Sequence, residues 1–528
     1  MLNIMPKVHH AMVTAPHYLA TAVGSRIMQQ GGNSFDASVA VSAALAVVYP
    51  HMTGLGGDAF FMVYKAGSGK VEGYNGSGRS GVHAVCERYA GKEVIPFRGA
   101  DSAITVPGMV DAWWSVWTRY GSLPWEQLLE PAARYAEDGF PVSRNLAEWI
   151  VKDKRLLEAS EPLKRLYQSG GQWLTEGDRL EQAELAATLR ALQRGGREAF
   201  YEGEVMKRLT AGIAAEGGLL TEDDFRLHAG EWVVPLNTSY RGWDVHQMPP
   251  NSQGFSLLMM LNMLENTELT AYPRNSAGFY HLMAEVVKRS FRDRDAYLTD
   301  PAFRHIPLHK LLSKSYAASL WADIAQAPPA AAPYLSQEMG QDTAYAAAVD
   351  EEGNAVSFIQ SLYFDFGSGW MPGGTGIVMQ NRGSFFSLDP LQPNVLEPRK
   401  RCFHTLMPGM VTRDGKPYLL LGTQGGEGQP QTTLSVLTGV LDYGLSIQEA
   451  IALPRWVYGR TWGDSGDTLK VEKRCGDGVL SELRANGHRV EAVRGWDGIM
   501  GQAQGIMIDR GVISGAADPR GDGCAIGW

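Results

Sequence analysis

Residues 343–369 read TAYAAAVDEEGNAVSFIQSLYFDFGSG, and this stretch decides how the rest of the chain is interpreted. Its apolar runs AYAAAV and NAVSFIQSLYF predict β-strands. Thr343 stands at the start of the first run. A threonine hydroxyl is a weak nucleophile, but an N-terminal threonine can use its own α-amine as the base that activates it. That chemistry requires a cut between Asp342 and Thr343. Threonine is also common in strands, so the alternative is that Thr343 simply begins one.

The spacing from Thr343 through Gly353-Asn354 to Ser361 and Gly367 resembles the start of the small subunit in the γ-glutamyltranspeptidase family. Further matches follow the family's order along nearly the whole chain. They are APHYLATAVGSRIMQQGGNSFDASVAVSAAL, GLGGDAFFMVY, VPGMVDAWW, YGSLPWEQLLEPAARYAEDGFPVS, MPPNSQGF, KRCFHTLMPGM, LGTQGGEGQPQ, DYGLSIQEAIALPRW and GAADPRGDG. The resemblance implies an α/β fold, the four-layer αββα sandwich of the N-terminal-nucleophile hydrolases. It also implies self-cleavage into a large subunit, residues 1–342, and a small subunit, residues 343–528, which together form one αββα unit.

Composition supports an enzyme and argues against several other classes of protein. The 528 residues are 44% hydrophobic, enough for a large core, and the net charge of −9 argues against nucleic-acid binding. Four widely spaced cysteines suggest a reducing compartment, and no run approaches the length of a membrane helix. With no apolar signal segment at the start, we expect a cytoplasmic protein that does not bind membranes.

The sequence offers no support for a metal or a cofactor. His305 and His309 have helical spacing, but Pro307 lies between them and the H-E-x-x-H pattern is absent. GLGGDAF matches neither common nucleotide-binding loop, and the chain has no G-x-S-x-G elbow. We therefore expect catalysis by amino-acid side chains alone.

Hydrophobic patterning predicts where helices and strands lie. Residues 17–49 read as two helices divided at Gly31-Gly32-Asn33, and residues 105–330 as a largely helical region. Ala327 to Pro333 reads as a surface connection. After Thr343 the pattern changes to short strands, including YLLLGT, with helices near residues 433–440 and 447–452.

Four residues form the expected catalytic group. The resemblance assigns the nucleophile and base to Thr343, and a hydrogen bond that orients Thr343 to Ser361, where the family usually has a second threonine. It assigns the oxyanion hole to the backbone N–H groups of Gly425 and Gly426. A serine keeps the hydrogen-bonding capacity of threonine, and glycine lets the backbone approach the substrate closely. Without the resemblance, Ser361 would read as a strand residue and the glycine pair as a turn.

The expected substrate-binding residues differ from the transpeptidase pattern. Asn381 is kept, but Arg382 replaces an acidic or amide residue, and Phe385 replaces the aspartate that binds the substrate ammonium group. A guanidinium repels an ammonium group, and a phenyl ring offers it no ion pair.

The remaining substrate-binding positions are also altered. His404 and Thr405 stand where the family has paired serines, and Tyr363 stands at an asparagine position, so we expect a smaller pocket. Arg79 lies about two places after the position of the family's carboxylate-binding arginine. Arg79 and Arg382 could alternatively form structural or surface ion pairs.

These differences suggest a short anionic amide as substrate and resemble the oxamate amidohydrolase branch of the family, which converts oxamate to oxalate and ammonia in the use of purine-derived nitrogen. The alternatives are a γ-glutamyl hydrolase or transpeptidase, a glutaryl-type acylase, and a cleaved protein without catalysis. The expected partners are the substrate and the two subunits of one precursor, with a higher homo-oligomer as a further possibility.

Overall fold

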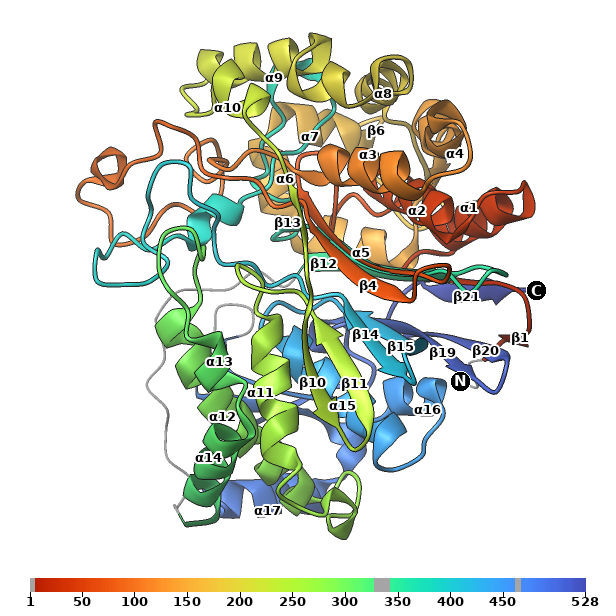
Figure 1. The fold of residues 1–528 in the computed structure, drawn as a ribbon. Helices are drawn as coiled ribbons and strands as arrows, with labels where there is room; N and C mark the ends of the chain where they lie inside the picture. Colours follow the sequence, from red (N-terminus) through yellow and green to blue (C-terminus); the bar gives the residue numbers. More distant parts are fainter. Residues whose placement is uncertain (1–4, 327–341, 461–466) are drawn as a thin grey trace.

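The computed structural model describes residues 5–326, 342–460 and 467–528. Two seven-stranded sheets pack face to face, with helices on both outer sides (Figure 1). We call them the nucleophile sheet, after the predicted nucleophile Thr343 that it contains, and the opposite sheet. The nucleophile sheet has the order β21 (Cys524–Gly527), β2 (Met12–Ala15), β12 (Asp342–Val349), β13 (Ala355–Tyr363), β3 (Asp58–Lys65), β4 (Lys70–Asn75) and β9 (Glu231–Val233). The opposite sheet has the order β1 (Lys7–Val8), β20 (Val512–Ala517), β19 (Ala503–Asp509), β15 (Lys416–Thr423), β14 (Gly409–Arg413), β11 (Trp243–Gln247) and β10 (Leu236–Tyr240).

Three apolar layers hold the sandwich together. Between the sheets lie buried side chains from both, among them Phe60, Tyr345, Ile359, Leu420 and Ile506. Such two-sided burial explains why AYAAAV is apolar throughout instead of alternating. A second apolar layer joins the nucleophile sheet to its helices, and a third joins the opposite sheet to its own.

Each sheet has its own helical cover (Figure 1). The nucleophile sheet is covered by α1 (Tyr18–Gln29), α2 (Ser34–Val48), α3 (Met109–Tyr120), α4 (Trp125–Asp138), α5 (Arg144–Lys152), α6 (Lys154–Ala159), α7 (Glu161–Leu166), α8 (Ala183–Tyr201), α9 (Glu204–Ala215) and α10 (Glu222–Arg226). The opposite sheet is covered by α11 (Gly254–Leu264), α12 (Ala277–Tyr297), α13 (Leu308–Leu311), α14 (Lys314–Gln326), α15 (Gly428–Leu441), α16 (Ile447–Ala452) and α17 (Asp477–Ala485). A small sheet, β16 (Trp456–Tyr458), β17 (Thr468–Glu472) and β18 (Arg489–Val493), lies near α15 and α17.

Most predicted elements are confirmed. The helices predicted for residues 17–49 are α1 and α2, and Gly31 between them has a left-handed φ of 93°. Asn33 caps α2 by accepting hydrogen bonds from the N–H groups of Phe35 and Asp36. The prediction that residues 105–330 are largely helical missed the strands β9, β10 and β11. The connection predicted at Ala327 to Pro333 lies outside the described residues.

No helix within the described ranges is both long enough and apolar enough to cross a membrane.

Candidate active site

The backbone around Thr343 is buried at an irregularity in strand β12. Asp342 pairs with Tyr363 of β13, whereas Ala344 pairs with Gln360, so the register shifts at Thr343. Tyr363 has φ = 86°, a left-handed conformation that costs energy for a residue with a side chain. The Asp342–Thr343 peptide therefore lies where the ladder is interrupted and the facing strand is strained.

Ser361 contacts the peptide that precedes Thr343. Its hydroxyl donates a hydrogen bond to the carbonyl oxygen of Asp342 and accepts one from the N–H of Tyr363 at 2.7 Å. A donor on a carbonyl oxygen makes its carbon more electrophilic. Ser361 thus contacts the carbonyl that Thr343 would attack in a self-cleavage reaction.

Gly425 and Gly426 form a glycine turn between β15 and α15. Their φ values are 127° and 52°, which favour glycine at both positions. The carbonyl oxygen of Gly425 accepts a hydrogen bond from the N–H of Gly428, and that of Gly426 accepts one from the N–H of Gln429, but neither glycine N–H donates one to a described residue. Two N–H groups that donate to no described residue, just before a helix, can stabilise an oxyanion.

Gln253 links this turn to the predicted substrate-binding residues. Its side-chain amide, at the start of α11, donates to the carbonyl oxygens of Thr405 at 3.0 Å and Gly426 at 2.9 Å. Arg294 in turn donates to the Gln253 side-chain oxygen at 3.1 Å. This buried amide therefore joins the glycine turn to the segment that contains Thr405. It lies within the MPPNSQGF motif, but the sequence did not single it out.

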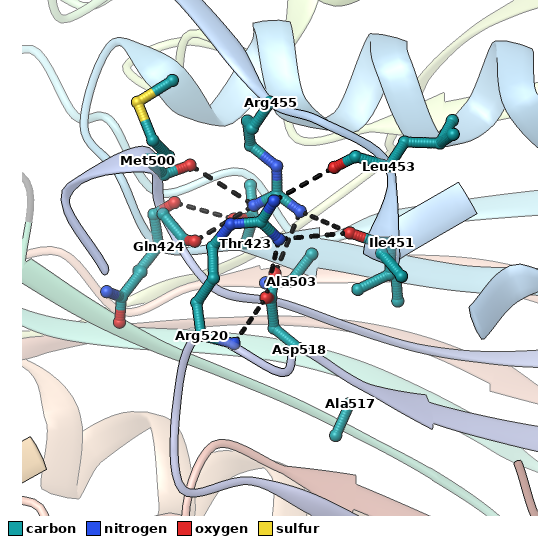
Figure 2. Close-up of polar contacts among 12 residues, drawn as sticks. Thr423, Gln424, Ile451, Leu453, Arg455, Met500, Ala503, Ala517, Asp518 and Arg520 are labelled. Carbon is teal, nitrogen blue, oxygen red and sulfur yellow. Dashed lines mark hydrogen bonds and ion pairs between the residues drawn. The ribbon is translucent and has the colours of Figure 1, made fainter. Parts of the chain in front are cut away.

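Two buried arginines and an aspartate lie beside Thr423 and Gln424, the residues that precede the glycine turn (Figure 2). Asp518 accepts hydrogen bonds from Arg455 and from the N–H of Ala503, each at 2.9 Å, and from Arg520 at 2.9 Å. Arg455 also donates to the carbonyl oxygen of Gly501 at 3.0 Å. Burial acts to raise the pKa of Asp518, but the two guanidinium groups hold that pKa below its usual range. The GAADPRGDG motif is thereby explained as an anchor for the strands that carry the glycine turn.

Arg382 is the most unusual group near the site, because it is fully buried and poorly satisfied. Its guanidinium stacks on the ring of Tyr363 at 3.8 Å and donates from Nη2 to the Thr405 hydroxyl at 3.4 Å. Its Nε and Nη1 atoms have no hydrogen-bond partner among the described residues. Burial lowers the pKa of Arg382 from its usual value. A buried cation with unused donors fits an anionic ligand.

Aromatic rings narrow the space beside Arg382. The rings of Tyr363 and Phe385 meet edge to face at 5.9 Å, and Phe385 packs against Phe403 at 4.9 Å. All three side chains are buried. Tyr363 and Phe385, the residues predicted to reduce the substrate pocket, therefore pack against each other beside Arg382.

Asp58 and His404 form a buried pair that the sequence did not predict as a unit. His404 Nε2 lies 3.1 Å from the Asp58 carboxylate, while His404 Nδ1 accepts the N–H of Leu406 at 3.4 Å, so Nε2 carries the proton and donates to Asp58. Burial raises the pKa of Asp58 to about 7, against hydrogen bonds from the N–H groups of Gly78 and Gly108 and the charge of Arg382, which lower it. The only sequence signal was an acidic residue inside the otherwise apolar GLGGDAFF run.

Two predicted substrate-binding residues have other partners. The Asn381 side chain accepts the N–H of Phe364 at 3.1 Å and donates to the carbonyl oxygen of Phe97 at 2.7 Å, so it supports the backbone. Arg79 forms an ion pair with Asp300 at 2.8 Å on a partly exposed surface. No described contact joins Arg79 to Thr343, Ser361 or Arg382.

One cluster within the described ranges has a composition that could hold a metal ion. It comprises His281 and Glu285 of α12 and His488 after α17. Glu285 is already paired with Lys288 and Arg289, each at 2.7 Å, and His281 Nδ1 lies 2.8 Å from His488 Nε2, a hydrogen-bond distance. The two cations beside Glu285 oppose the binding of a metal ion. The contact between His281 and His488 joins α12 to the segment after α17.

Comparisons with known proteins identify relatives over the whole chain. The family model described as γ-glutamyltranspeptidase matches residues 20–528. A Bacillus subtilis protein named "Glutathione hydrolase-like YwrD proenzyme" is 52% identical, with 98% of each chain covered. The "Oxamate amidohydrolase proenzyme" of Klebsiella pneumoniae is 37% identical, again with 98% of each covered.

A solved structure extends the agreement to the fold. The cephalosporin acylase of Bacillus halodurans superposes with a TM-score of 0.91 at 35% identity, covering 100% of this chain and 97% of that one. The predicted fold of the N-terminal-nucleophile hydrolases is confirmed, as is the predicted class of enzyme, one that acts on amide bonds. The chain belongs to the γ-glutamyltranspeptidase family.

Proposed function

We propose that this protein is a self-processing amidohydrolase that cuts its own Asp342–Thr343 bond and then hydrolyses a small anionic amide, with oxamate as the favoured substrate. The observation that carries the substrate class is the buried guanidinium of Arg382 with two nitrogens that have no partner among the described residues. A substrate carboxylate would satisfy those donors and neutralise the buried charge.

After the cut, Thr343 supplies both the nucleophile and the base. Its hydroxyl attacks the substrate amide carbon while its α-amine takes the hydroxyl proton. The N–H groups of Gly425 and Gly426 stabilise the oxyanion. When the substrate C–N bond breaks, the protonated α-amine of Thr343 gives its proton to the leaving nitrogen, which departs as ammonia in the case of oxamate. Water then hydrolyses the ester on Thr343 and regenerates the enzyme. Ser361 orients Thr343 throughout.

The relatives support the general reaction and leave two other substrate classes in view. The 52% identical B. subtilis protein is named as glutathione hydrolase-like, and the similar solved structure is named as a cephalosporin acylase. A γ-glutamyl substrate carries an α-ammonium group that needs an acidic partner. Beside Arg382 the structure offers two aromatic rings and Asp58, whose carboxylate is already bound by His404, Gly78 and Gly108. This pocket therefore favours a substrate without an ammonium group.

The test of substrate class is product release from a panel of amides by the purified, cut enzyme. We expect ammonia from oxamate at a far higher kcat/KM than from glutamine, and little product from glutathione or glutaryl amides. Efficient turnover of γ-glutamyl-p-nitroanilide without ammonia release from oxamate would replace this proposal by the ordinary γ-glutamyl function.

The test of self-cleavage is the variant Thr343→Ala. The wild-type chain should give fragments of 342 and 186 residues, since 528 − 342 = 186, and the smaller should begin TAYAAAV. Thr343→Ala should remain a single inactive chain. Cleavage of that variant at the same bond would exclude Thr343 as the nucleophile.

A further inference from the structure

Three carboxyl groups meet at the bond that we propose is cut. Asp342 is buried, at 1% exposure, and pairs in strand register with Tyr363, two residues before Asp365, whose carboxyl interacts with that of Asp342. Asp153, at the junction of α5 and α6, hydrogen-bonds to the same Asp365 carboxyl. Two carboxyl groups share a hydrogen bond only if one of them carries a proton.

Asp365 is the member of the cluster that is held as an anion. Arg98 donates to its carboxylate at 2.6 Å and also donates to the backbone carbonyl oxygens of Asp365 and Gly367. Burial acts to raise the pKa of Asp365, but Arg98 and the two carboxyl donors hold it below its usual range.

Burial and the neighbouring Asp365 charge favour the protonated forms of Asp342 and Asp153. No N–H or O–H donor among the described residues reaches either oxygen of the Asp342 carboxyl, or Oδ2 of Asp153. Burial and the charge of Asp365 raise the pKa of Asp342 well above its usual value, and the same two causes raise the pKa of Asp153 to about 8. Both groups thus donate to the central Asp365 carboxylate at neutral pH.

The other charged groups around the cluster do not offset this arrangement. Lys152, whose ammonium group lies over the Trp149 ring at 3.6 Å, attracts all three carboxyl groups and also Asp497. Tyr49, which also interacts with Asp342, has its pKa raised chiefly by burial, with further contributions from Asp522, Asp342 and Asp518. Arg98 and Lys152 are the cations that face the cluster, and Arg98 is already bound to Asp365.

We propose that Asp365 and Asp153 are positioning residues for self-cleavage. Together they hold the neutral Asp342 side chain, and with it the scissile carbonyl group, against Ser361 before the cut. After the cut, the Asp365 carboxylate repels the new α-carboxylate of Asp342. This inference rests on the proposed self-cleavage of the Asp342–Thr343 bond.

The chemistry of the cut explains why the interaction between Asp342 and Asp365 changes from attraction to repulsion. The Thr343 hydroxyl oxygen bonds to the Asp342 carbonyl carbon, the C–N bond breaks, and the hydroxyl proton goes to the new α-amine. Water then breaks the ester, leaving the hydroxyl on Thr343 and a carboxylic acid on Asp342. That α-carboxyl group ionises at neutral pH, releasing its proton to solvent. Asp342 thereby gains a negative charge beside the Asp365 carboxylate, and the two like charges repel.

The pH dependence of self-cleavage tests the first half of the inference. The full chain is synthesised in a short cell-free reaction, diluted into buffers from pH 6 to pH 10, and the fraction cut is followed on gels. The ratio of wild-type to Asp342→Asn rates should be near one at pH 6 and fall at least tenfold by pH 10, because only the wild-type side chain ionises. Asp153→Asn should show a smaller effect of the same kind, and Asp497→Asn, which lacks contact with Asp342, should match wild type.

Accessibility of the new end tests the second half. After the cut, carboxypeptidase should remove Asp342 several-fold faster from the wild-type enzyme than from Asp365→Asn, in which the repelling charge is gone. A ratio that stays constant from pH 6 to pH 10, or equal digestion of the two enzymes, would overturn the inference and leave the proposed function standing. Absence of cleavage at every pH would overturn both.

Discussion

Replacing Arg382 by methionine should separate substrate binding from folding. The guanidinium stacks on Tyr363 and makes one weak hydrogen bond, to Thr405 at 3.4 Å, so its removal breaks little of the protein's own structure. Methionine has a similar length and no charge to bury. Replacing a poorly satisfied buried charge by an apolar side chain is often neutral or stabilising. The melting temperature of the uncut Thr343→Ala protein should therefore stay the same or rise when Arg382→Met is added.

Hydrolysis of oxamate should fall sharply in the same variant. A hydrogen bond to a charged group contributes about 1.5–3 kcal/mol, and a carboxylate left unpaired in a buried site costs about 3–5 kcal/mol. Taking about 3 kcal/mol as the loss, kcat/KM for oxamate should drop on the order of 10²-fold. Arg382→Lys keeps the charge without the planar fork and should recover part of the loss.

The assay is ammonia release by the cut enzyme over a range of oxamate concentrations, alongside the extent of self-cleavage on gels. Self-cleavage should be unaffected, because no substrate carboxylate takes part in it. Wild-type kcat/KM in a fully cut Arg382→Met enzyme would refute the assignment of Arg382 to the substrate carboxylate. A fall in melting temperature of many degrees would instead identify it as a structural residue.

Three further changes have defined outcomes. Ser361→Ala should slow maturation or turnover about tenfold, since the lost hydrogen bond contributes about 1 kcal/mol or more; rates equal to wild type for both steps would remove it from the site. For Asp58, whose pKa is raised to about 7, kcat/KM for oxamate should fall as pH rises above 7, because the ionised carboxylate competes for Arg382, and Asp58→Asn should flatten this fall; identical profiles would contradict the idea. Asp518→Ala should lower the free energy of unfolding of the uncut Thr343→Ala protein by about 3–5 kcal/mol in urea, because it leaves the buried Arg455 without its carboxylate partner, whereas Arg520 keeps Glu472; a loss below about 1 kcal/mol would show that the cluster is not an anchor.

The sequence predicted elements and motifs well where the signal is local. The turn at Gly31 to Asn33 carries its own capping residues, and α16 begins and ends where the pattern placed it, at Ile447 and Ala452. The strands β9, β10 and β11 were missed because they are only three to five residues long and stand between helical segments.

Contacts between distant parts of the chain were harder to predict. Asp58 and His404 are 346 positions apart, and only the packed sheets bring them together. Motif order placed Arg79 near the substrate, but its ion pair with Asp300 depends on a fold-level contact that the local sequence does not encode. The roles assigned to Thr343, Ser361, Gly425 and Gly426 stay predictions, although the structure brings Ser361 to the carbonyl group before Thr343.

The alternation of strands in the two sheets has a consequence for the order of events in the life of this protein. Each sheet mixes strands that precede Thr343 with strands that follow it: β2 pairs with β12, and β11 pairs with β14. A cut at Thr343 would leave two chains that share both sheets and all three apolar layers, so neither fragment has a core of its own. Dilution should not separate them without unfolding, and the fragments should not exchange between molecules. Folding must then come before cleavage, because the intact chain closes these long-range contacts within one molecule, whereas two separated chains would also have to find each other. Heat should accordingly inactivate the cut enzyme irreversibly, while the uncut Thr343→Ala chain retains the connectivity needed to refold.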